Sequence, residues 1–293
     1  MKADLASGNR TSRNPTGDGD VENSVVRMIM RPPGDALRRA LSGHPDRDRI
    51  DPERARSQHA AFVEALETAG VVVTLLPTEA DMPDACFTSD TLLAFSRPGE
   101  LQTALVVATL PGAPTRRPEV PSVLACARRM APGADVVEIR DPGTLDGGDV
   151  IIFGGRVAIG VSARTNEAGA RQLATAAGRF GYRAFLCPVD DRLHLASGVT
   201  PLSARRLIGT RSGFQSLDAA GPEVAPDDVE RLVIEDKAAG GANVLVAGGR
   251  CFVARGFPSA VATLASAGES VVEVELDEFL FADGGPTCLV VAI

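Results

Sequence analysis

Residues 148–160 read GDVIIFGGRVAIG, and residues 242–254 repeat the same pattern as ANVLVAGGRCFVA. Each stretch predicts an apolar strand, a Gly-Gly turn followed by arginine, and a second strand, because a two-residue glycine turn suits the twist of a hairpin. The two arginines, Arg156 and Arg250, lie 94 positions apart. This spacing leaves room for one further unit between them, so the implied repeat is about 47 residues long.

The same order of elements recurs along the chain. A strand pair is followed by an amphipathic helix and then by a third strand, and five such units fit the length. Units of this kind cannot bury their apolar faces alone, so we expect them to pack around a common axis. The predicted fold is a five-bladed α/β propeller of strand-strand-helix-strand repeats around a central channel. An open doubly wound sheet is the alternative, and the hairpins inside the units argue against it. The helices are expected at residues 52–69, 118–130, 165–180 and 258–267.

Composition limits the classes to which the chain can belong. It has 293 residues, 44% of them hydrophobic, which is enough for a full core. A net charge of −8 argues against a nucleic-acid partner, and no apolar run approaches the roughly 20 residues that cross a bilayer. Residues 1–24 are polar and predict a disordered tail, whereas residues 25–293 predict one domain. Five cysteines without a CxxC pair argue against disulfides and zinc, so we expect a cytoplasmic protein without metal or cofactor.

Three short runs place reactive side chains beside glycines or apolar residues at predicted strand ends. Asp146 lies in LDGGDV (145–150), where its carboxylate can point into the channel, although turn aspartates often only bond backbone amides. His194 lies between two leucines, so in a strand it points to the face opposite theirs. Cys288 lies in DGGPTCLVV (283–291), at the predicted start of a terminal strand that ends the fifth unit, and its glycine-rich surroundings suit the rim of a site. The other cysteines lie in apolar stretches and are expected to be ordinary core residues: Cys86, Cys126, Cys187 and Cys251.

These runs and three others resemble the signature segments of the dimethylarginine dimethylaminohydrolase family. The segments occur in order along the chain, and six ordered segments are far more specific than any one of them. The resemblance implies the five-bladed α/β propeller of the guanidino-group-modifying (pentein) superfamily, the same fold that the repeats predict. The similar segments are DACFTSD (84–90), PGAPTRR (111–117), LDGGDV (145–150), VSARTN (161–166), LHL (193–195) and DGGPTC (283–288).

The resemblance also implies a hydrolase that converts Nω-methylated arginine to citrulline and an alkylamine. Cys288 would be the nucleophile, His194 the general acid and base, and Asp146 the carboxylate paired with it. A guanidinium carbon is a poor electrophile, so attack on it needs a thiolate and a proton donor for the departing amine. We expect a covalent thiouronium on the cysteine, which water then hydrolyses with help from the histidine.

Further positions are expected to contact the substrate. By matching segments, carboxylates hold the guanidinium group and arginines hold the α-carboxylate, a task that suits the bidentate guanidinium fork. Ser89 stands where the family usually has glutamate, and this leaves the preferred N-substituent open. The expected contacts are Asp84, Asp90 and Asp283 to the guanidinium, Arg116 and Arg164 to the α-carboxylate, and Leu41 and Ser89 in the substrate pocket.

Other members of the superfamily would use the same three reactive side chains. An arginine deiminase, a hydrolase of another N-substituted arginine such as hydroxyarginine, and an amidinotransferase are open alternatives, although deiminases and transferases are generally longer. A non-catalytic binding protein of this fold is a further alternative, but it has no reason to keep Cys288, His194 and Asp146 together. The expected partner is a small arginine derivative, not nucleic acid or membrane, and homodimerisation is left open.

Overall fold

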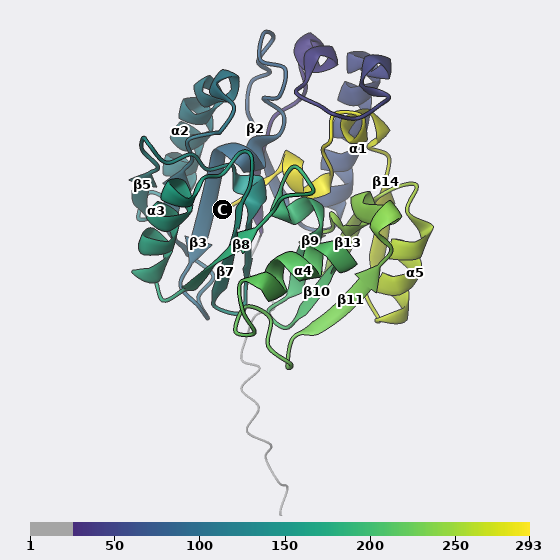
Figure 1. Cartoon of the computed structure of the whole chain (residues 1–293). Coiled ribbons are helices and arrows are strands. Elements are labelled where there is room, and N and C mark those ends of the chain that lie inside the picture. Colours follow the sequence, from purple (N-terminus) through teal and green to yellow (C-terminus); the bar gives the residue numbers. More distant parts are fainter. Residues whose placement is uncertain (1–25) are drawn as a thin grey trace, which may run out of the picture.

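A computed structural model describes residues 26–293 of the chain (Figure 1). The predicted disordered tail, residues 1–24, lies outside the described residues, and the division into a tail and one domain stays a prediction. The described residues form five three-stranded sheets of the same topology. In each sheet the middle strand pairs antiparallel with one neighbour and parallel with the other. The predicted five-repeat α/β fold is therefore confirmed.

Four of the units follow the chain in the order strand, strand, helix, strand. The helix connects the middle strand to the parallel outer strand, since parallel neighbours need a long crossover connection. The units are β3 (Leu92–Ser96), β4 (Thr103–Ala108), α2 (Val120–Met130) and β5 (Asp135–Glu138); β6 (Val150–Phe153), β7 (Arg156–Val161), α3 (Glu167–Gly178) and β8 (Arg183–Pro188); β9 (Val199–Ser203), β10 (Arg206–Thr210), α4 (Arg211–Ala219) and β11 (Glu230–Ile234); and β12 (Leu245–Ala247), β13 (Arg250–Ala254), α5 (Pro258–Ser266) and β14 (Val271–Val274), after which α6 (Asp277–Leu280) follows.

The remaining sheet joins segments that are far apart in the sequence. It contains β1 (Arg27–Met30) and β2 (Val72–Leu75), connected by α1 (Pro52–Thr68), together with β15 (Val291–Ala292). β15 pairs antiparallel with β1 and takes the inner place for which the first unit has no strand of its own. The prediction that the strand after Cys288 completes the fifth unit is therefore wrong, because that strand completes the first.

Both predicted Gly-Gly hairpins are present. Gly154 and Gly155 adopt φ angles of 52° and 75°, and Gly248 and Gly249 adopt 53° and 69°. Glycine takes up two successive left-handed conformations without strain, and a two-residue turn between twisted strands requires them. The unit between these hairpins is β9–β10, which turns without a glycine pair, and this is why the repeat is blurred there in the sequence.

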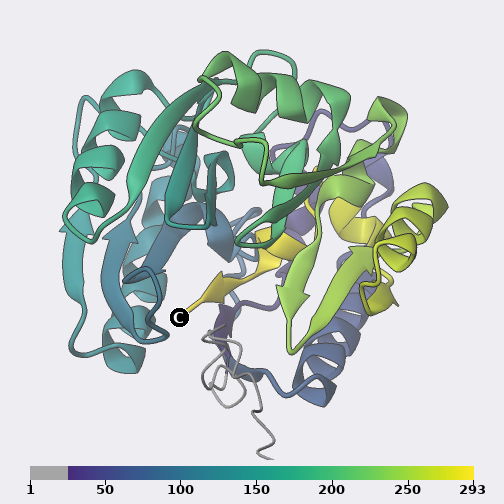
Figure 2. The ribbon, with the colours of Figure 1, turned by 90° about the horizontal axis from the view of Figure 1, so that it is seen from below.

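The helices lie at the rim of the molecule, outside the sheets (Figure 2). The four predicted helices are confirmed as α1, α2, α3 and α5, with ends within two residues of those expected. Asp51 caps α1 and Asn166 caps α3, each by accepting backbone amide hydrogens of the first turn. The face of α3 that points inward contains Leu173 and Ala177, and both side chains are fully buried. No helix among residues 26–293 is both long and apolar enough to cross a membrane.

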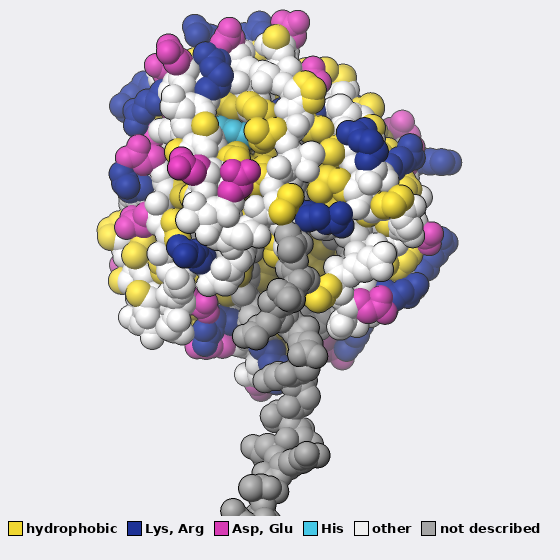
Figure 3. Space-filling model, turned by 180° about the vertical axis from the view of Figure 1, so that it is seen from behind, with side chains coloured by type: hydrophobic (Ala, Val, Ile, Leu, Met, Phe, Trp, Pro, Cys, Tyr) yellow, Lys and Arg dark blue, Asp and Glu magenta, His cyan; other side chains and the backbone are white. Residues whose placement is uncertain are grey.

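The inner strands of all five sheets line a central hollow of about 390 Å³. The lining is largely apolar, as expected where alternate side chains of short strands face one another. Figure 3 shows hydrophobic side chains gathered toward the middle of one face, with charged side chains beside and around them. His194 and Cys288 lie in the wall of this hollow, so two predicted site residues meet at the axis that the repeats predict.

Candidate active site

The position of His194 between two leucines predicted a strand, but His194 does not lie in one. It directly precedes a short 3₁₀ helix, Leu195–Ser197, although its own backbone is extended. The amide of Leu195 donates to Asp149 Oδ1 at 3.0 Å instead of to a neighbouring strand. Three alternating residues are too few to specify a strand against such a bond. The side chain of His194 still lines both a small pocket and the central hollow.

Cys288 lies within a 3₁₀ helix, Pro286–Leu289, and not on the first residue of a strand as predicted. Pro286 begins this helix because its missing N–H has no cost at a helix N-terminus. The two glycines directly before it are packed so closely that a side chain there would strike Phe87 or Asn243. The glycine-rich turn therefore fixes the thiol against neighbouring units.

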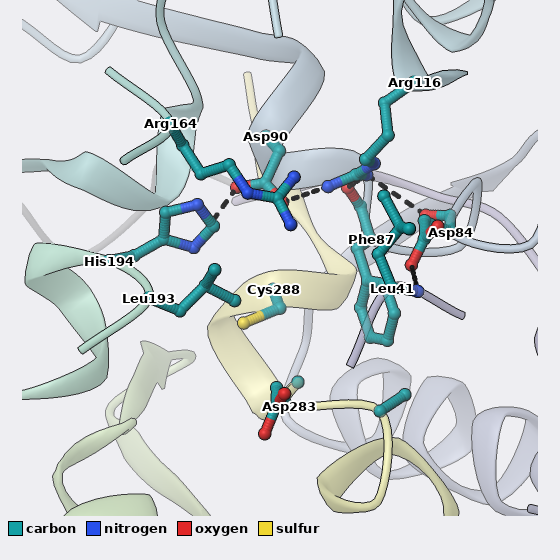
Figure 4. Close-up of a pocket in the computed structure, with 12 residues that line it drawn as sticks. Leu41, Asp84, Phe87, Asp90, Arg116, Arg164, Leu193, His194, Asp283 and Cys288 are labelled. Carbon is teal, nitrogen blue, oxygen red and sulfur yellow. Dashed lines mark hydrogen bonds and ion pairs between the residues drawn. The ribbon is translucent and has the colours of Figure 1, made fainter. Parts of the chain in front are cut away.

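Most of the predicted site residues converge on one small pocket (Figure 4). Its wall combines a thiol, an imidazole, three carboxylates and two guanidinium groups. Asp146 lies behind His194, to which it bonds, and Ser89 lines the central hollow instead of the pocket. The predicted residues that meet in the pocket wall are Leu41, Asp84, Asp90, Arg116, Arg164, His194, Asp283 and Cys288.

His194 is buried among carboxylates. Its Nε2 lies 3.2 Å from Asp146 Oδ2, and its Nδ1 lies 3.9 Å from Asp90 Oδ1. Burial by itself lowers the pKa of His194, but Asp90, Asp146 and Asp149 together outweigh it and raise the pKa to about 9. The imidazole is therefore protonated at neutral pH and can donate a proton into the pocket.

Asp146 is fully buried and bonds groups from several segments. Its Oδ1 accepts the amide hydrogen of Gly112 at 2.8 Å, and its own amide donates to Thr165 Oγ1 at 3.0 Å. Its Oδ2 faces His194, and Arg164 Nη1 lies 4.0 Å from the same oxygen. The carboxylate therefore holds the imidazole from behind and does more than cap its own turn.

Arg116 is buried, and its guanidinium is occupied within the protein. Its Nε and Nη2 donate to Glu119, Nη2 also donates to the carbonyls of Asp84 and Phe87, and Nη1 donates to Asp90. One N–H on Nη1 is left without a partner among residues 26–293. The expected bidentate grip on an α-carboxylate is not possible in this arrangement, and a contact of Arg116 with substrate stays a prediction.

Arg164 is the predicted arginine that keeps its guanidinium open to the pocket. Its side chain is 19% exposed, and within the described part of the chain its one ion pair is the 4.0 Å contact with Asp146. Ser162 fixes the backbone here, since its hydroxyl accepts the amide hydrogen of Arg164 and donates to Asp149. Figure 4 shows the guanidinium lying across the pocket near His194. Arg164 is therefore placed to meet an anion at the pocket mouth.

Residues 41–43 form a closing segment that bonds two of the predicted guanidinium-binding carboxylates. The amide of Leu41 donates to Asp84 Oδ1 at 3.0 Å, and the amide of Gly43 donates to Asp283 Oδ2 at 2.7 Å. Asp283 has a φ of 57°, unique among described non-glycine residues, which its surroundings must hold. The cavity inside the pocket has a volume of about 20 Å³, enough for about one water molecule. Backbone amides of the closing segment therefore occupy an oxygen of Asp84 and an oxygen of Asp283 in this structure.

The thiol of Cys288 is not activated by its resting surroundings. Burial raises its pKa and the negative charge of Asp90 raises it further, although contacts with Gly285, Thr287 and Asn243 act in the opposite direction. A cation bound beside the sulfur would favour the thiolate. The site therefore suits a positively charged substrate that ionises its own nucleophile.

Asn243 is a site residue that the sequence reasoning missed. Its Oδ1 accepts hydrogen bonds from the amide and hydroxyl of Thr287 at 2.9 and 3.0 Å, and its Nδ2 lies 3.7 Å from the Cys288 sulfur. The repeat contained the signal, because Asn243 occupies the place in one hairpin that Asp149 occupies in the other. Asp149 likewise bonds the residue after His194.

Equivalent hydrogen bonds join successive units around the axis. In each case a polar side chain at the start of an inner strand accepts the amide hydrogen of a residue in the next unit. Each donor lies within two residues of Asp146, His194 or Cys288, so the bonds that join the units also position the site. The donor and acceptor pairs are Gly148 and Asp90, Leu195 and Asp149, and Thr287 and Asn243.

Ser89 lies near the reactive side chains but on the side of the central hollow. His194 and Cys288 border both the hollow and the pocket, whereas Ser89 borders only the hollow. Its carbonyl packs against the backbone at Gly147, where an added Cβ would lie 1.9 Å from the Ser89 oxygen. A larger residue at position 89 would therefore change the hollow beside the thiol and the imidazole.

Asp90, Asp146 and His194 place possible ligand atoms within 4.8 Å of one another. Asp146 and Asp90 face opposite nitrogens of the same imidazole, and Asp90 also accepts bonds from Arg116 and Gly148. Nothing further at these residues points to an ion, and we assign no metal or cofactor to them.

The chain is similar to known proteins over most of its length. The family model described as N,N dimethylarginine dimethylhydrolase, eukaryotic, matches residues 33–193. The N(G),N(G)-dimethylarginine dimethylaminohydrolase of Streptomyces coelicolor is 33% identical over 91% of this chain and 96% of that protein. The enzyme of the same name from Pseudomonas aeruginosa is 31% identical over 90% and 96%. The chain belongs to the dimethylarginine dimethylaminohydrolase family.

Solved structures of dimethylarginine dimethylaminohydrolases share the fold. A cysteine-to-serine mutant of the Pseudomonas aeruginosa enzyme, complexed with citrulline, aligns with a TM-score of 0.81 at 30% identity, covering 91% of this chain and 98% of that chain. An adduct of a histidine-to-glycine mutant with S-methyl-L-thiocitrulline gives 0.81 at 29% identity, covering 92% and 100%. The N-terminal domain of ArgZ, an arginine dihydrolase, gives 0.77 at 21% identity, covering 92% and 97%, and supports the fold alone. The predicted family and fold class are confirmed.

Proposed function

We propose that the protein hydrolyses Nω-methylated arginine to citrulline and dimethylamine or methylamine. The observation that carries the proposal is the convergence of the Cys288 thiol, the protonated His194 imidazole and three carboxylates on one pocket of a chain of this family. Relatives are named for this reaction, and one solved relative holds citrulline. A cytoplasmic location stays a prediction, and homodimerisation stays open.

Substrate binding begins with an exchange of partners. The guanidinium group displaces the closing segment from Asp84 and Asp283, whose carboxylates then accept from guanidinium nitrogens in place of backbone amides. The α-carboxylate of the substrate meets Arg164 at the mouth. This arrangement places the guanidinium carbon beside Cys288, and the positive charges of the substrate and His194 favour the thiolate there.

The first half of the reaction forms a covalent adduct. The Cys288 thiolate attacks the guanidinium carbon and forms a carbon–sulfur bond, which gives a tetrahedral adduct. Nε2 of His194 is held by Asp146, and Nδ1 lies on the side of Asp90, which lines the pocket, so Nδ1 passes its proton to the departing amine. The carbon–nitrogen bond breaks, and a thiouronium on Cys288 and a neutral His194 remain.

The second half of the reaction releases citrulline. Neutral His194 takes a proton from water, and the water oxygen attacks the thiouronium carbon. The adduct collapses, the Cys288 thiolate leaves, the hydroxyl group releases its proton to solvent, where the released amine takes it up, and the carbon becomes the carbonyl of the ureido group. One imidazole edge therefore serves first as acid and then as base.

A substrate panel tests the proposal directly. Purified protein is assayed with asymmetric dimethylarginine, monomethylarginine, hydroxyarginine and arginine, and both citrulline and the released amine are measured. We expect equal amounts of citrulline and alkylamine from a methylated substrate. Ammonia from arginine as the main product would indicate a deiminase, and absence of citrulline from all four would end the hydrolase proposal.

Replacement of Arg164 by glutamine is expected to raise KM more than it lowers kcat. The charged pair with the α-carboxylate is worth about 1.5–3 kcal/mol, so kcat/KM should fall about 10- to 100-fold. Arg164→Lys keeps the charge without the fork and should recover part of the loss. The measurement is steady-state kinetics with dimethylarginine and with its decarboxylated analogue. An equal loss with the decarboxylated substrate would contradict a contact to the carboxylate.

Replacement of Ser89 by glutamate is expected to shift preference toward methylated arginine. The new side chain adds volume and charge to the hollow beside His194 and Cys288, and it restores the residue that the family usually has. The ratio of kcat/KM for dimethylarginine over arginine should rise about tenfold, which corresponds to about 1.4 kcal/mol. Ser89→Gln adds the same volume without the charge and separates the two effects. An unchanged ranking in both variants would remove Ser89 from the determinants of specificity.

A further inference from the structure

Glu119 is a buried carboxylate that the proposed reaction does not use. It is 1% exposed and ends the 3₁₀ helix Pro114–Glu119, directly before α2. Both of its oxygens accept from Arg116, with distances of 2.9 Å from Nη2 and 3.2 to 3.3 Å from Nε. A carboxylate that is withdrawn from water and bonded this closely to one arginine fixes the orientation of that guanidinium.

The opposite side of the same guanidinium reaches the reactive side chains. Arg116 Nη1 donates to Asp90 Oδ2, and the other oxygen of Asp90 accepts the amide hydrogen of Gly148 at 2.9 Å. That oxygen also lies 3.9 Å from His194 Nδ1, the edge from which the proton leaves. A continuous line of contacts therefore runs from Glu119 through Arg116 and Asp90 to His194.

We propose that Glu119 is a positioning residue which, through Arg116, fixes Asp90 and sets the net negative charge that Asp90 presents to His194 and Cys288. The kinetic consequences of this proposal rest on the proposed function, whereas the contacts among Glu119, Arg116 and Asp90 do not depend on it. It also gives Arg116 a role inside the protein, while its contact with substrate stays a prediction.

The charges of Glu119, Arg116 and Asp90 explain why both Arg116 and Glu119 affect His194. Arg116 alone would neutralise Asp90, whereas Glu119 claims part of the positive charge of Arg116 and leaves Asp90 negative enough to stabilise the imidazolium. Burial raises the pKa of Glu119 to about 7, so Glu119 is ionised in the pH range near 9 in which His194 titrates. His194 and Arg116 outweigh burial and lower the pKa of Asp90. Charged groups that face Glu119 are Arg116, Arg31, Asp84 and Asp90, and those that face His194 are Asp90, Asp146, Asp149 and Arg164.

Removing the charge of Glu119 and removing the charge of Arg116 should therefore shift the pKa of His194 in opposite directions. Glu119→Gln removes a negative charge behind Arg116, so Asp90 is neutralised more fully and the pKa of His194 falls. Arg116→Gln exposes the full charge of Asp90, so the pKa of His194 rises. NMR titration of the His194 ring in the protein without substrate measures both shifts. This readout needs no activity, so its result is independent of whether the proposed hydrolase function is correct.

Kinetics provide the second readout. Glu119→Gln is expected to lower kcat about tenfold and to change KM by less than about threefold, because it disturbs a group beside the imidazole and no group that binds the α-carboxylate. In the Arg116→Gln background the same change should have no further effect, since Glu119 acts through Arg116. Glu278→Gln is the matched control, since Glu278 is 2% exposed, lies 3.5 Å from Arg54 and does not line the pocket.

Several results would overturn the proposal. Shifts of the His194 pKa in the same direction in both variants, no shift in either, or fully additive losses in the double variant would each do so. If Arg116→Gln does not fold, Arg116→Lys replaces it. That variant keeps the charge but loses the fork, so kcat should fall while the His194 titration stays near that of the unmodified protein. A lysine variant with full kcat would count against positioning by Arg116.

Discussion

Replacement of Cys288 by serine is expected to lower the rate of citrulline formation by about 10⁴-fold or more. A serine hydroxyl in this position has no base in contact that could deprotonate it, and its alkoxide is far less accessible than a thiolate. The pocket and its ion pairs are unaffected, because the two side chains differ by one atom. Rates measured by citrulline assay should therefore collapse while binding of dimethylarginine, followed by calorimetry, is retained.

Cys251→Ser is a matched control for the nucleophile. Its sulfur lies 3.7 Å from Glu269 Oε2, so a hydroxyl there finds an acceptor, and the residue is remote from the pocket. This variant should keep its activity. Full activity of Cys288→Ser with any substrate of the panel, or equal losses in both variants, would contradict the assignment of Cys288 as nucleophile.

Replacement of His194 by alanine is expected to lower kcat by about 10²–10⁴-fold with dimethylarginine. The departing amine then lacks a proton donor, and the adduct lacks a base for water. S-methyl-L-thiocitrulline separates these two steps, because a thiolate leaves without being protonated. With this substrate the variant should still form the covalent adduct but should hydrolyse it slowly. Mass spectrometry of the intact protein, taken over time, should show the adduct mass accumulate.

The pH dependence gives the same residue a second signature. His194 donates a proton, so kcat/KM should be lost as the pH rises through its pKa of about 9. The thiolate of Cys288, whose pKa is also raised, makes kcat/KM rise with pH on the acid side, which places the optimum on the alkaline side of neutrality. The alkaline limb should disappear in His194→Ala. A limb that persists there, or an adduct that turns over at the normal rate, would remove His194 from its role.

Much of the fold could be predicted from the sequence because the repeat is local. Two glycine pairs identify their hairpins, and the amphipathic helices that follow have capped or proline-marked starts at Asp51, Asn166 and Pro258. The place of β15 could not be predicted, since its pairing with β1 is a long-range contact that no local pattern encodes. The strand was therefore assigned to the unit that precedes it in the chain.

The site was predictable as a set of residues but not as a set of contacts. The ordered segments contain Cys288, His194 and Asp146, and the structure brings all three together. They do not reveal that Arg116 turns inward to Glu119, because the sequence around Arg116 gives no sign of which side of the chain is buried. Asn243 was missed for a similar reason, since its importance comes from the turn of another unit that it bonds.

Because β15 pairs with β1, we expect the segment that contains Cys288 to take its place late in folding. Met28 and Ala292, which face each other across this seam, are 264 positions apart, and contacts of such separation form slowly because the loop they close is long. The imidazole and its carboxylate partners belong to inner units that can assemble earlier. We therefore expect a chain in which β15 has not yet paired with β1 to contain the imidazole in place but not the thiol, so that activity appears only when this pairing forms.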